Sequence, residues 1–204
     1  MKCNREFYLR SGLEVARDLI GKKLVHNSPE GLTSGIIVET EAYMGAIDAA
    51  AHSYKGLTER TKIQYGLGGY VYVYLIYGMY VCMNVVANIE EIPECVLIRA
   101  LQPLDGVDLM KIRRKKNNLR DLCSGPGKLT QAMGITKNHY GIDLCGDEIF
   151  IEEVENFIPN ITATKRINVD YAGDAANYLW RFILTDSEFI SGTKLLNLNF
   201  EGDK

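Results

Sequence analysis

Two glutamates one residue apart, Glu39 and Glu41, lie in the segment IIVETEAY at residues 36–43. Side chains alternate along a strand, so both carboxylates are expected on one face, with their Cα atoms about 6.6 Å apart. In this prediction Ile37 and Tyr43 share that face. The opposite face, predicted to be core, carries Ile36, Val38, Thr40 and Ala42. Two carboxylates at this range can act as acid and base in glycosidic-bond hydrolysis, and the alternative is a solvated strand face.

Arg99 interrupts the apolar strand VLIRAL at residues 96–101. An arginine inside a strand needs a carboxylate partner or an anionic ligand, because an unpaired buried charge is strongly destabilising. His52, one of three histidines, lies in a polar stretch at residues 44–69, where a surface position is the simpler interpretation.

Tyr77 and Gly78 separate two apolar runs, YVYLI and MYVCMNVV. A residue followed by Gly between such runs is typical of a two-residue hairpin turn, which places Tyr77 at the tip. An apolar side chain held there can insert between base pairs and kink a duplex. The alternative is that Tyr77 folds back onto its own sheet.

A basic cluster follows in the second half of the chain, while residues 143–160 hold six acids and no Lys or Arg. The cluster is interpreted either as a solvated helix face or as a phosphate-facing side. The segment SGPGKLTQAMG then predicts a helix start whose free N–H groups and Lys128 can hold a phosphate, with plain capping as the alternative. The basic residues are Lys111, Arg113, Arg114, Lys115, Lys116 and Arg120.

Composition narrows the class of protein. The 204 residues are 47% hydrophobic and 24% charged, which is typical of an ordinary globular domain and excludes a disordered tail, a collagen-like repeat and a coiled coil. The net charge of −3 argues against a protein that coats nucleic acid or membrane through bulk charge. Tyr is unusually frequent, at 12 residues against 6 Phe and 1 Trp.

The five cysteines are an odd number without a C-x-x-C pair, so neither a disulfide framework nor a zinc site is predicted. Reduced thiols, no secretion signal in MKCNREFYLR and no membrane span indicate a cytoplasmic protein. The most apolar stretch, residues 70–87, is shorter than the ~20 residues of a spanning helix and alternates like two strands.

The elements that must position these residues alternate in type without a linker or repeat. We predict a single α+β domain over residues 1–204, with a curved, mostly antiparallel sheet, surrounding helices and a protruding β-hairpin. Helices are predicted at 12–20, capped by Ser11 or Gly12, and at 105–120 and 124–135. Strands are predicted at 22–27, 34–43, 70–87 (as a hairpin) and 95–101, with short strands from residue 143 onward.

Taken together, these segments resemble the alkyladenine (3-methyladenine) DNA glycosylases of the mammalian type, in their short bacterial form. The resemblance implies a monofunctional base-excision enzyme that flips a damaged purine out of duplex DNA and hydrolyses its N-glycosidic bond. It implies double-stranded DNA as the partner, action as a monomer at the bacterial nucleoid, and neither metal nor cofactor. The matching segments are VETEAY and AAHS within 38–53, YVYLIYGMYVCMN (72–84), VLIRALQP (96–103), LCSGPGKLTQAMGI (122–135) and the weaker AGDAANYLWRF (172–182).

The resemblance also implies residue roles. Glu41 falls on the general base that activates water, Arg99 helps to hold that water and the carboxylate, and the carbonyl of Ile190 completes the water site. Tyr77 falls on the intercalating tyrosine, and Glu39 is expected to have a supporting structural role. The base pocket would be formed by Tyr43, His52, Tyr74 and Asn84, with Asn84 discriminating against the guanine amino group. Phosphate contacts are expected from Lys128, Arg113 and Arg114.

Two departures from the family pattern precede the hairpin. Gln64-Tyr65 stands where the family commonly has Met-Phe, and Gly68-Gly69 where it has Pro-Gly. The change at Gly68 is expected to loosen a turn beside the pocket and alter the range of damaged bases accepted. Two other functions remain open at this point: a non-catalytic lesion-binding module, and a hydrolase of nucleosides or glycosides that uses Glu39 and Glu41.

Overall fold

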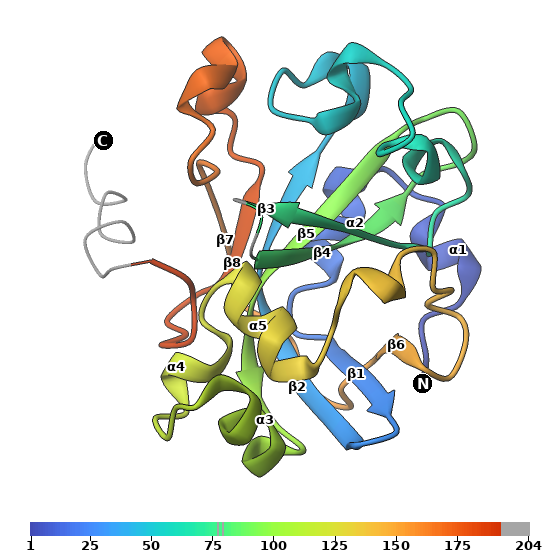
Figure 1. Cartoon of the computed structure of the whole chain (residues 1–204). Helices are drawn as coiled ribbons and strands as arrows, with labels where there is room; N and C mark the ends of the chain where they lie inside the picture. Colours follow the sequence, from blue (N-terminus) through green and yellow to red (C-terminus); the bar gives the residue numbers. More distant parts are fainter. Residues whose placement is uncertain (77, 79, 193–204) are drawn as a thin grey trace, which may run out of the picture.

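The computed structural model describes residues 1–76, 78 and 80–192. Within them the fold is a single α+β domain built on a curled, eight-stranded antiparallel sheet, as predicted (Figure 1). Six strands follow the order β3-β4-β5-β2-β1-β6, and β8 joins β7 to β2. The strands are β1 (Lys23–Ser28), β2 (Gly31–Tyr43), β3 (Val71–Ile76), β4 (Tyr80–Ala87), β5 (Glu94–Pro103), β6 (Ile149–Glu152), β7 (Ile161–Thr164) and β8 (Arg181–Leu184).

Strand β2 is the centre of the sheet, because it pairs with β1, β5 and β8. It starts three residues earlier than predicted, since Ser28 pairs with Gly31 and leaves Pro29 and Glu30 as a two-residue turn. Its far end carries the two glutamates between β5 and β8, so the acidic segment is buried rather than an exposed strand face.

The predicted alternation along β2 is wrong at one point. The pairing with β5 shifts on both sides of Glu39, and such a bulge exchanges the faces of the residues that follow it. Ile37 therefore packs with Ala42 in the main core, whereas Val38 packs with Ala100 in a second cluster. Ile37 does not share a face with the glutamates.

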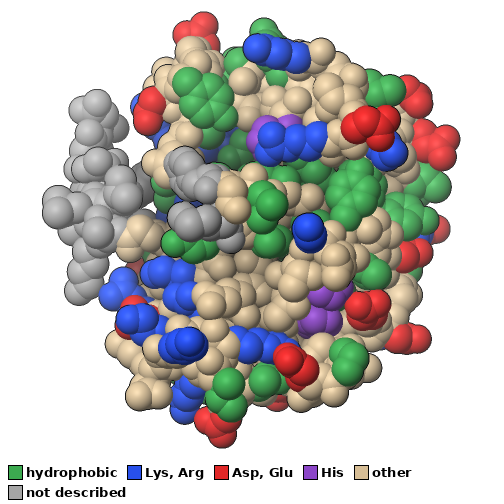
Figure 2. All heavy atoms as spheres, viewed as in Figure 1, with side chains coloured by type: hydrophobic (Ala, Val, Ile, Leu, Met, Phe, Trp, Pro, Cys, Tyr) green, Lys and Arg blue, Asp and Glu red, His purple; other side chains and the backbone are tan. Residues whose placement is uncertain are grey.

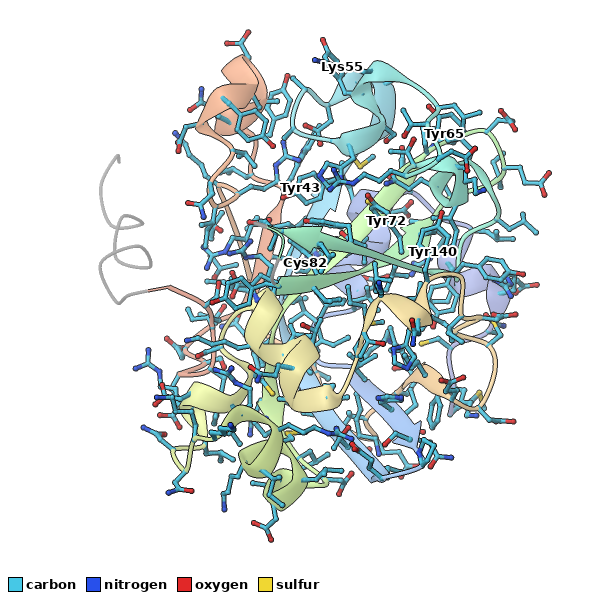
Figure 3. The ribbon with its side chains drawn as sticks, in the orientation of Figure 1. Tyr43, Lys55, Tyr65, Tyr72, Cys82 and Tyr140 are labelled. Atoms are coloured by element: carbon cyan, nitrogen blue, oxygen red, sulfur yellow. The ribbon has the colours of Figure 1, made fainter. Side chains whose placement is uncertain are left out.

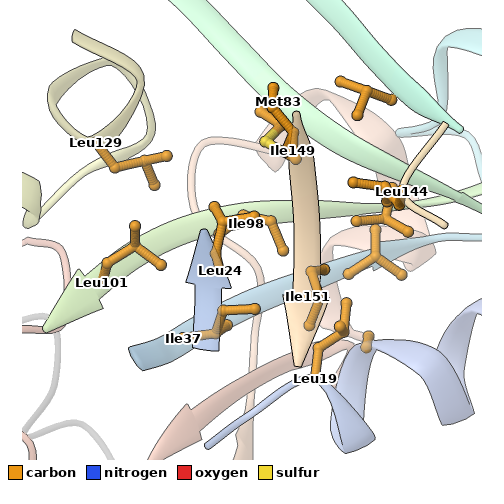
Figure 4. Close-up of a cluster of buried hydrophobic side chains, with 14 of the residues drawn as sticks. Leu19, Leu24, Ile37, Met83, Ile98, Leu101, Leu129, Leu144, Ile149 and Ile151 are labelled. Carbon is orange, nitrogen blue, oxygen red and sulfur yellow. The ribbon is translucent and has the colours of Figure 1, made fainter. Parts of the chain in front are cut away.

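Helices cover the sheet and complete the core. Helix α2 packs on β2 and β5, and α5 packs on β4 and β5 with α3 and α4 beside it. Leu19 at the C-terminal end of α2, Ile98 of β5 and Leu129 of α5 are fully buried together (Figure 4). Burying one such side chain contributes about 1.5–3 kcal/mol. The α-helices are α1 (Arg5–Tyr8), α2 (Gly12–Asp18), α3 (Val107–Arg114), α4 (Arg120–Cys123) and α5 (Pro126–Met133).

The helices at 12–20 and 124–135 are confirmed with shorter bounds, and Ser11 caps the first through its Oγ. The prediction of one helix over 105–120 is wrong, because α3 ends at Arg114. Lys115 adopts a left-handed conformation, and the Asn117-Asn118 pair that follows favours turns over helix.

The polar stretch at 44–69 forms three single-turn helices, η1 (Gly45–Ile47), η2 (His52–Lys55) and η3 (Lys62–Tyr65). The expectation that Gly68 loosens this region is wrong. Its amide donates to the Asn88 carbonyl, its carbonyl accepts from Arg5, and an added Cβ would lie 2.2 Å from the Tyr8 carbonyl oxygen. Gly68 therefore allows a close approach of two backbone segments.

Strands β3 and β4 form the predicted hairpin, but the prediction of a two-residue turn is wrong, because Ile76 pairs with Tyr80 and three residues connect the strands. Of these three, Tyr77 lies outside the described residues. All five cysteines are free thiols, four of them buried. No helix in the described part of the chain is both long and apolar enough to cross a bilayer.

Candidate active site

A cavity of about 710 Å³ opens beside the glutamate-bearing end of β2. Its wall is assembled from segments far apart in sequence: the 44–69 stretch, the β3–β4 hairpin, strand β5, the start of α5 and the loop before η5 (Asp170–Asn177). The lining includes Tyr43, His52, Arg60, Tyr74, Tyr80, Cys82, Asn84, Leu97, Arg99, Arg114, Lys128, Ile167, Asn168 and Tyr171. Figure 3 shows Tyr43 and Cys82 on the elements that border it.

Glu41 lies directly behind this wall and is fully buried. Its Oε2 accepts a hydrogen bond from the Tyr43 hydroxyl at 2.9 Å and one from Arg99 Nη1 at 3.2 Å. Its Oε1 accepts from the Ile167 amide at 2.7 Å. All three donors belong to cavity-lining residues, so the carboxylate is fixed against the cavity in a form that suits the ionised state.

Glu39 is also fully buried, but its partners lie deeper. Its Oε1 accepts from Arg99 Nε at 2.9 Å, Arg181 Nε at 2.7 Å and Ser191 Oγ at 2.8 Å, and its Oε2 accepts from the Ser191 amide. Four donors therefore hold this carboxylate in place. A supporting structural role for Glu39 stays a prediction.

Arg99 connects the two glutamates by one guanidinium. Burial alone lowers its pKa, but the charges of Glu41 and Glu39 outweigh burial and raise the pKa above its ordinary value. Tyr43 shifts in the same direction: burial and the neighbouring Glu41 charge hold its pKa well above the ordinary value, so its hydroxyl stays a donor. Together with Arg181, the cluster contains two carboxylates and two guanidinium groups, and its formal charge is balanced.

Tyr43 is supported from outside the cavity by a second buried ion pair. The Arg166 guanidinium lies 4.8 Å from the Tyr43 ring centroid and 5.1 Å from that of Trp180. Both of its terminal nitrogens donate to the Asp48 carboxylate, and both groups are fully buried. Because Arg166 directly precedes Ile167, this pair also positions the amide that binds Glu41.

The other wall of the cavity is aromatic. His52 meets Tyr74 edge to face, with ring centroids 4.6 Å apart, and Tyr74 lies 5.5 Å from Tyr72. Arg60 crosses this group: its Nε donates to the Tyr72 hydroxyl at 3.2 Å, and its Nη2 lies 3.2 Å from His52 Nε2. His52 Nδ1 lies 3.0 Å from the same Tyr72 oxygen.

These contacts fix the tautomer of His52. An arginine nitrogen can donate but not accept, so His52 Nε2 must be the acceptor and the ring proton lies on Nδ1. Partial burial of the ring and the nearby Arg60 charge lower the pKa of His52 to about 4.

We expect NMR of ¹⁵N-labelled protein to find the Nδ1–H tautomer of His52, with a titration near pH 4. Since the folded pKa lies below the ordinary 6.5, the stabilising contribution of His52 is complete above pH 6.5 and is lost as the pH falls towards 4. A ring that titrates near pH 6.5, or that carries its proton on Nε2, would contradict the Arg60 contact.

The structure brings most of the predicted site residues together. Tyr43, His52, Tyr74, Asn84 and Arg99 all line the cavity, and Asn84 is held by a bond from its Nδ2 to the Tyr72 carbonyl. Their roles in binding a base remain predictions.

The predicted phosphate contacts separate into two groups. Lys128 and Arg114 border the cavity. Arg113 is instead bonded to Glu30 and to the Ala132 carbonyl, and it is absent from the cavity wall. Ile190 is buried beside Ser191, and the role of its carbonyl stays a prediction.

Sequence reasoning missed Arg60, Tyr72, Arg166 and Arg181. Tyr72 shares a strand face with Tyr74, and this two-residue spacing was a usable signal. The arginines gave no such signal, because their partners lie far away in the sequence.

The described residues contain one group with the composition of a metal site. Ligand atoms of His26, His139 and Glu148 lie within 4.8 Å of one another. However, His139 Nδ1 accepts the Thr136 amide at 2.8 Å, so the ring proton lies on Nε2, the atom that faces Glu148. A metal needs a lone pair at that atom, so this tautomer does not fit, and none of the three residues lines the cavity.

The amino-acid sequence is similar to those of known proteins over most of its length. Residues 6–188 match the family described as Methylpurine-DNA glycosylase (MPG). A protein of Alkaliphilus oremlandii (strain OhILAs) is 51% identical over 202 residues, covering 94% of this chain and 99% of the relative. A protein of Clostridium novyi (strain NT) is 48% identical over 200 residues, covering 93% and 98%. Both carry the name "Putative 3-methyladenine DNA glycosylase".

Proposed function

The chain belongs to the methylpurine-DNA glycosylase family, and we propose that it excises alkylated or deaminated purines from duplex DNA by hydrolysing the N-glycosidic bond. The observation that carries this proposal is Glu41, buried against the cavity and held there by Tyr43, Arg99 and the Ile167 amide. A cavity of about 710 Å³ is large enough for a purine with its sugar.

In the proposed reaction, the damaged nucleotide leaves the base stack and enters the cavity, because its anomeric carbon is out of reach inside a duplex. Glu41 accepts a proton from water, and that water attacks the anomeric carbon while the bond to the base breaks. Arg99 keeps the carboxylate oriented, and the Ile190 carbonyl completes the water site. An alkylated purine with a positive charge departs as a neutral base and needs no strong general acid.

The pocket residues have separate tasks in this proposal. Tyr43 stacks on one face of the base, while His52 and Tyr74 enclose it from the other side. Asn84 crowds the position of a guanine amino group. Tyr77, which lies outside the described residues, fills the gap that the flipped nucleotide leaves in the duplex.

The duplex is proposed to lie across the face that carries the cavity mouth. Lysine and arginine side chains gather at the lower left of this face, over helices α3 to α5 (Figure 2). They attract phosphates locally although the net charge is −3, which fits the cytoplasmic enzyme acting on chromosomal DNA that we propose. We further propose that residues 1–204 work as one domain and as a monomer.

One experiment separates this function from the two alternatives. The protein is incubated with one damaged base presented either in a duplex oligonucleotide or as the free nucleoside, and base release is measured by chromatography. We expect release from the duplex alone. Preferential release from the nucleoside would favour a nucleoside hydrolase, and tight duplex binding without release would favour a lesion-binding module.

A further inference from the structure

Arg60 introduces a positive charge into the aromatic wall of the cavity. Its guanidinium carbon lies 5.0 Å from the Tyr74 ring centroid, within the range of a cation–π contact. The side chain is anchored by the Tyr72 hydroxyl and bonded to His52 Nε2. A cation therefore already occupies the wall that would otherwise attract a positively charged base.

The Arg60–His52 bond also places a hydrogen-bond donor next to an acceptor at the cavity surface. Arg60 Nη2 offers N–H groups, and His52 Nε2 carries a lone pair because its proton lies on Nδ1. A purine with an oxygen at C6 and a hydrogen on N1 has the complementary order, acceptor beside donor. Such an edge replaces one protein–protein bond by two bonds to the base. An adenine edge, with a donor at C6 and an acceptor at N1, does not match.

A neutral purine also needs help to leave. When its bond to the anomeric carbon breaks, the electron pair passes to N9 and spreads over the ring to O6, and a proton is taken up from water afterwards. A guanidinium that donates to O6 stabilises the charge that develops there. No Asp or Glu side chain lines the cavity among the described residues, and Arg60 is the lining arginine that lies beside the His52 acceptor and is anchored there by the Tyr72 hydroxyl.

We propose that Arg60 is a specificity-determining residue that favours neutral 6-oxopurine lesions, hypoxanthine in DNA being the simplest, over positively charged N-methylated purines. This proposal rests on the glycosylase function proposed above. Arg60 acts by donating to O6 and by repelling a charged ring from the same wall.

The test compares single-turnover excision of hypoxanthine and 7-methylguanine from matched duplexes. Both bases have an oxygen at C6, and 7-methylguanine is positively charged. In Arg60→Gln we expect the ratio of the hypoxanthine rate to the 7-methylguanine rate to fall about tenfold. Only hypoxanthine leaves with negative charge on O6 for the guanidinium to stabilise, and only 7-methylguanine is repelled by the guanidinium. Arg60→Lys keeps the charge but loses the two-point attachment, and an intermediate ratio is expected.

Lys55→Gln is the matched control. Lys55 is an exposed cation on η2, in the same 44–69 stretch as Arg60, but it does not line the cavity (Figure 3). Its ratio should equal that of the wild type. Arg60 is itself exposed, so its replacement should leave the melting temperature within a few degrees. If the wild type releases both bases and Arg60→Gln leaves the ratio unchanged, the Arg60 proposal is overturned. If the folded wild type releases neither base, the glycosylase function itself fails.

Discussion

Replacing Glu41 by glutamine is expected to lower single-turnover excision by about 10²- to 10⁴-fold, the range that a positioned general base contributes. The amide cannot take a proton from water, yet it has nearly the shape of the carboxylate. The measurement is base release from an excess of enzyme over a single-lesion duplex.

A matched binding experiment separates loss of chemistry from loss of fold. In the Glu41→Gln variant the new side-chain NH₂ group would face a donor in either orientation, the Ile167 amide or the Tyr43 and Arg99 donors, and this mismatch costs about 1–3 kcal/mol. Binding to a duplex with an abasic-site analogue should nevertheless be retained. Excision at the wild-type rate would show that Glu41 takes no part in the reaction. Loss of both duplex binding and the cooperative melting transition would show that the variant does not fold. Glu41→Asp, which keeps the carboxylate, is therefore measured beside it.

Replacing Glu39 by glutamine is expected to have the largest effect on stability, a loss of about 3–5 kcal/mol in the free energy of unfolding. The change removes one of two buried carboxylates and leaves Arg99 and Arg181 with Glu41 as the one remaining negative charge among the described groups of this cluster. For a chain of this length the melting temperature should fall by about 10 °C, and calorimetry measures it directly.

Glu153→Gln is the control for that variant. Glu153 forms an ion pair with Lys22 at 2.6 Å, but its side chain is 53% exposed, and such surface pairs contribute about 0–1 kcal/mol. Its melting temperature should therefore change by no more than a few degrees. If Glu39→Gln melted with the wild type but lost excision, Glu39 would take part in the reaction rather than in the support of Arg99.

The sequence was sufficient for the parts of the site that depend on local order. Strand alternation predicted that Glu39, Glu41 and Tyr43 point the same way. For Glu41 and Tyr43 the structure agrees, because the hydroxyl of the cavity-lining Tyr43 donates to the Glu41 carboxylate. The isolated Arg99 predicted either a carboxylate partner or an anionic ligand, and the structure supplies two carboxylates. These inferences succeeded because they use only the alternation of side chains along a strand and the destabilising effect of an unpaired buried charge. Both rules apply to any protein, whatever the rest of its fold.

The parts that failed depend on pairing across the fold. Because of the bulge at Glu39, Ile37 lies in the main core. This bulge depends on how β5 pairs with β2, which cannot be inferred from residues 36–43 alone. The same holds for Arg166, whose partner Asp48 is 118 residues away. Gly68 was interpreted as a loose turn because the closeness of the Tyr8 backbone cannot be inferred from neighbouring residues.

The surplus of tyrosine acquires a structural explanation in this arrangement. Tyr43 binds Glu41, and Tyr72 anchors both Arg60 and His52. Tyr74 carries the Arg60 guanidinium on its ring. Tyrosine suits these positions because it combines a large apolar ring with a polar end that can hydrogen bond.

The role of Glu41 in base release is tested most directly by identifying the products from a duplex that contains a single hypoxanthine. We predict that the wild type releases free hypoxanthine and leaves an uncut strand that breaks at the lesion only after treatment with alkali. We also predict that Glu41→Gln, folded and bound to the same duplex, releases almost none in the same time. Equal release by both proteins, or no release by the folded wild type, would contradict this role.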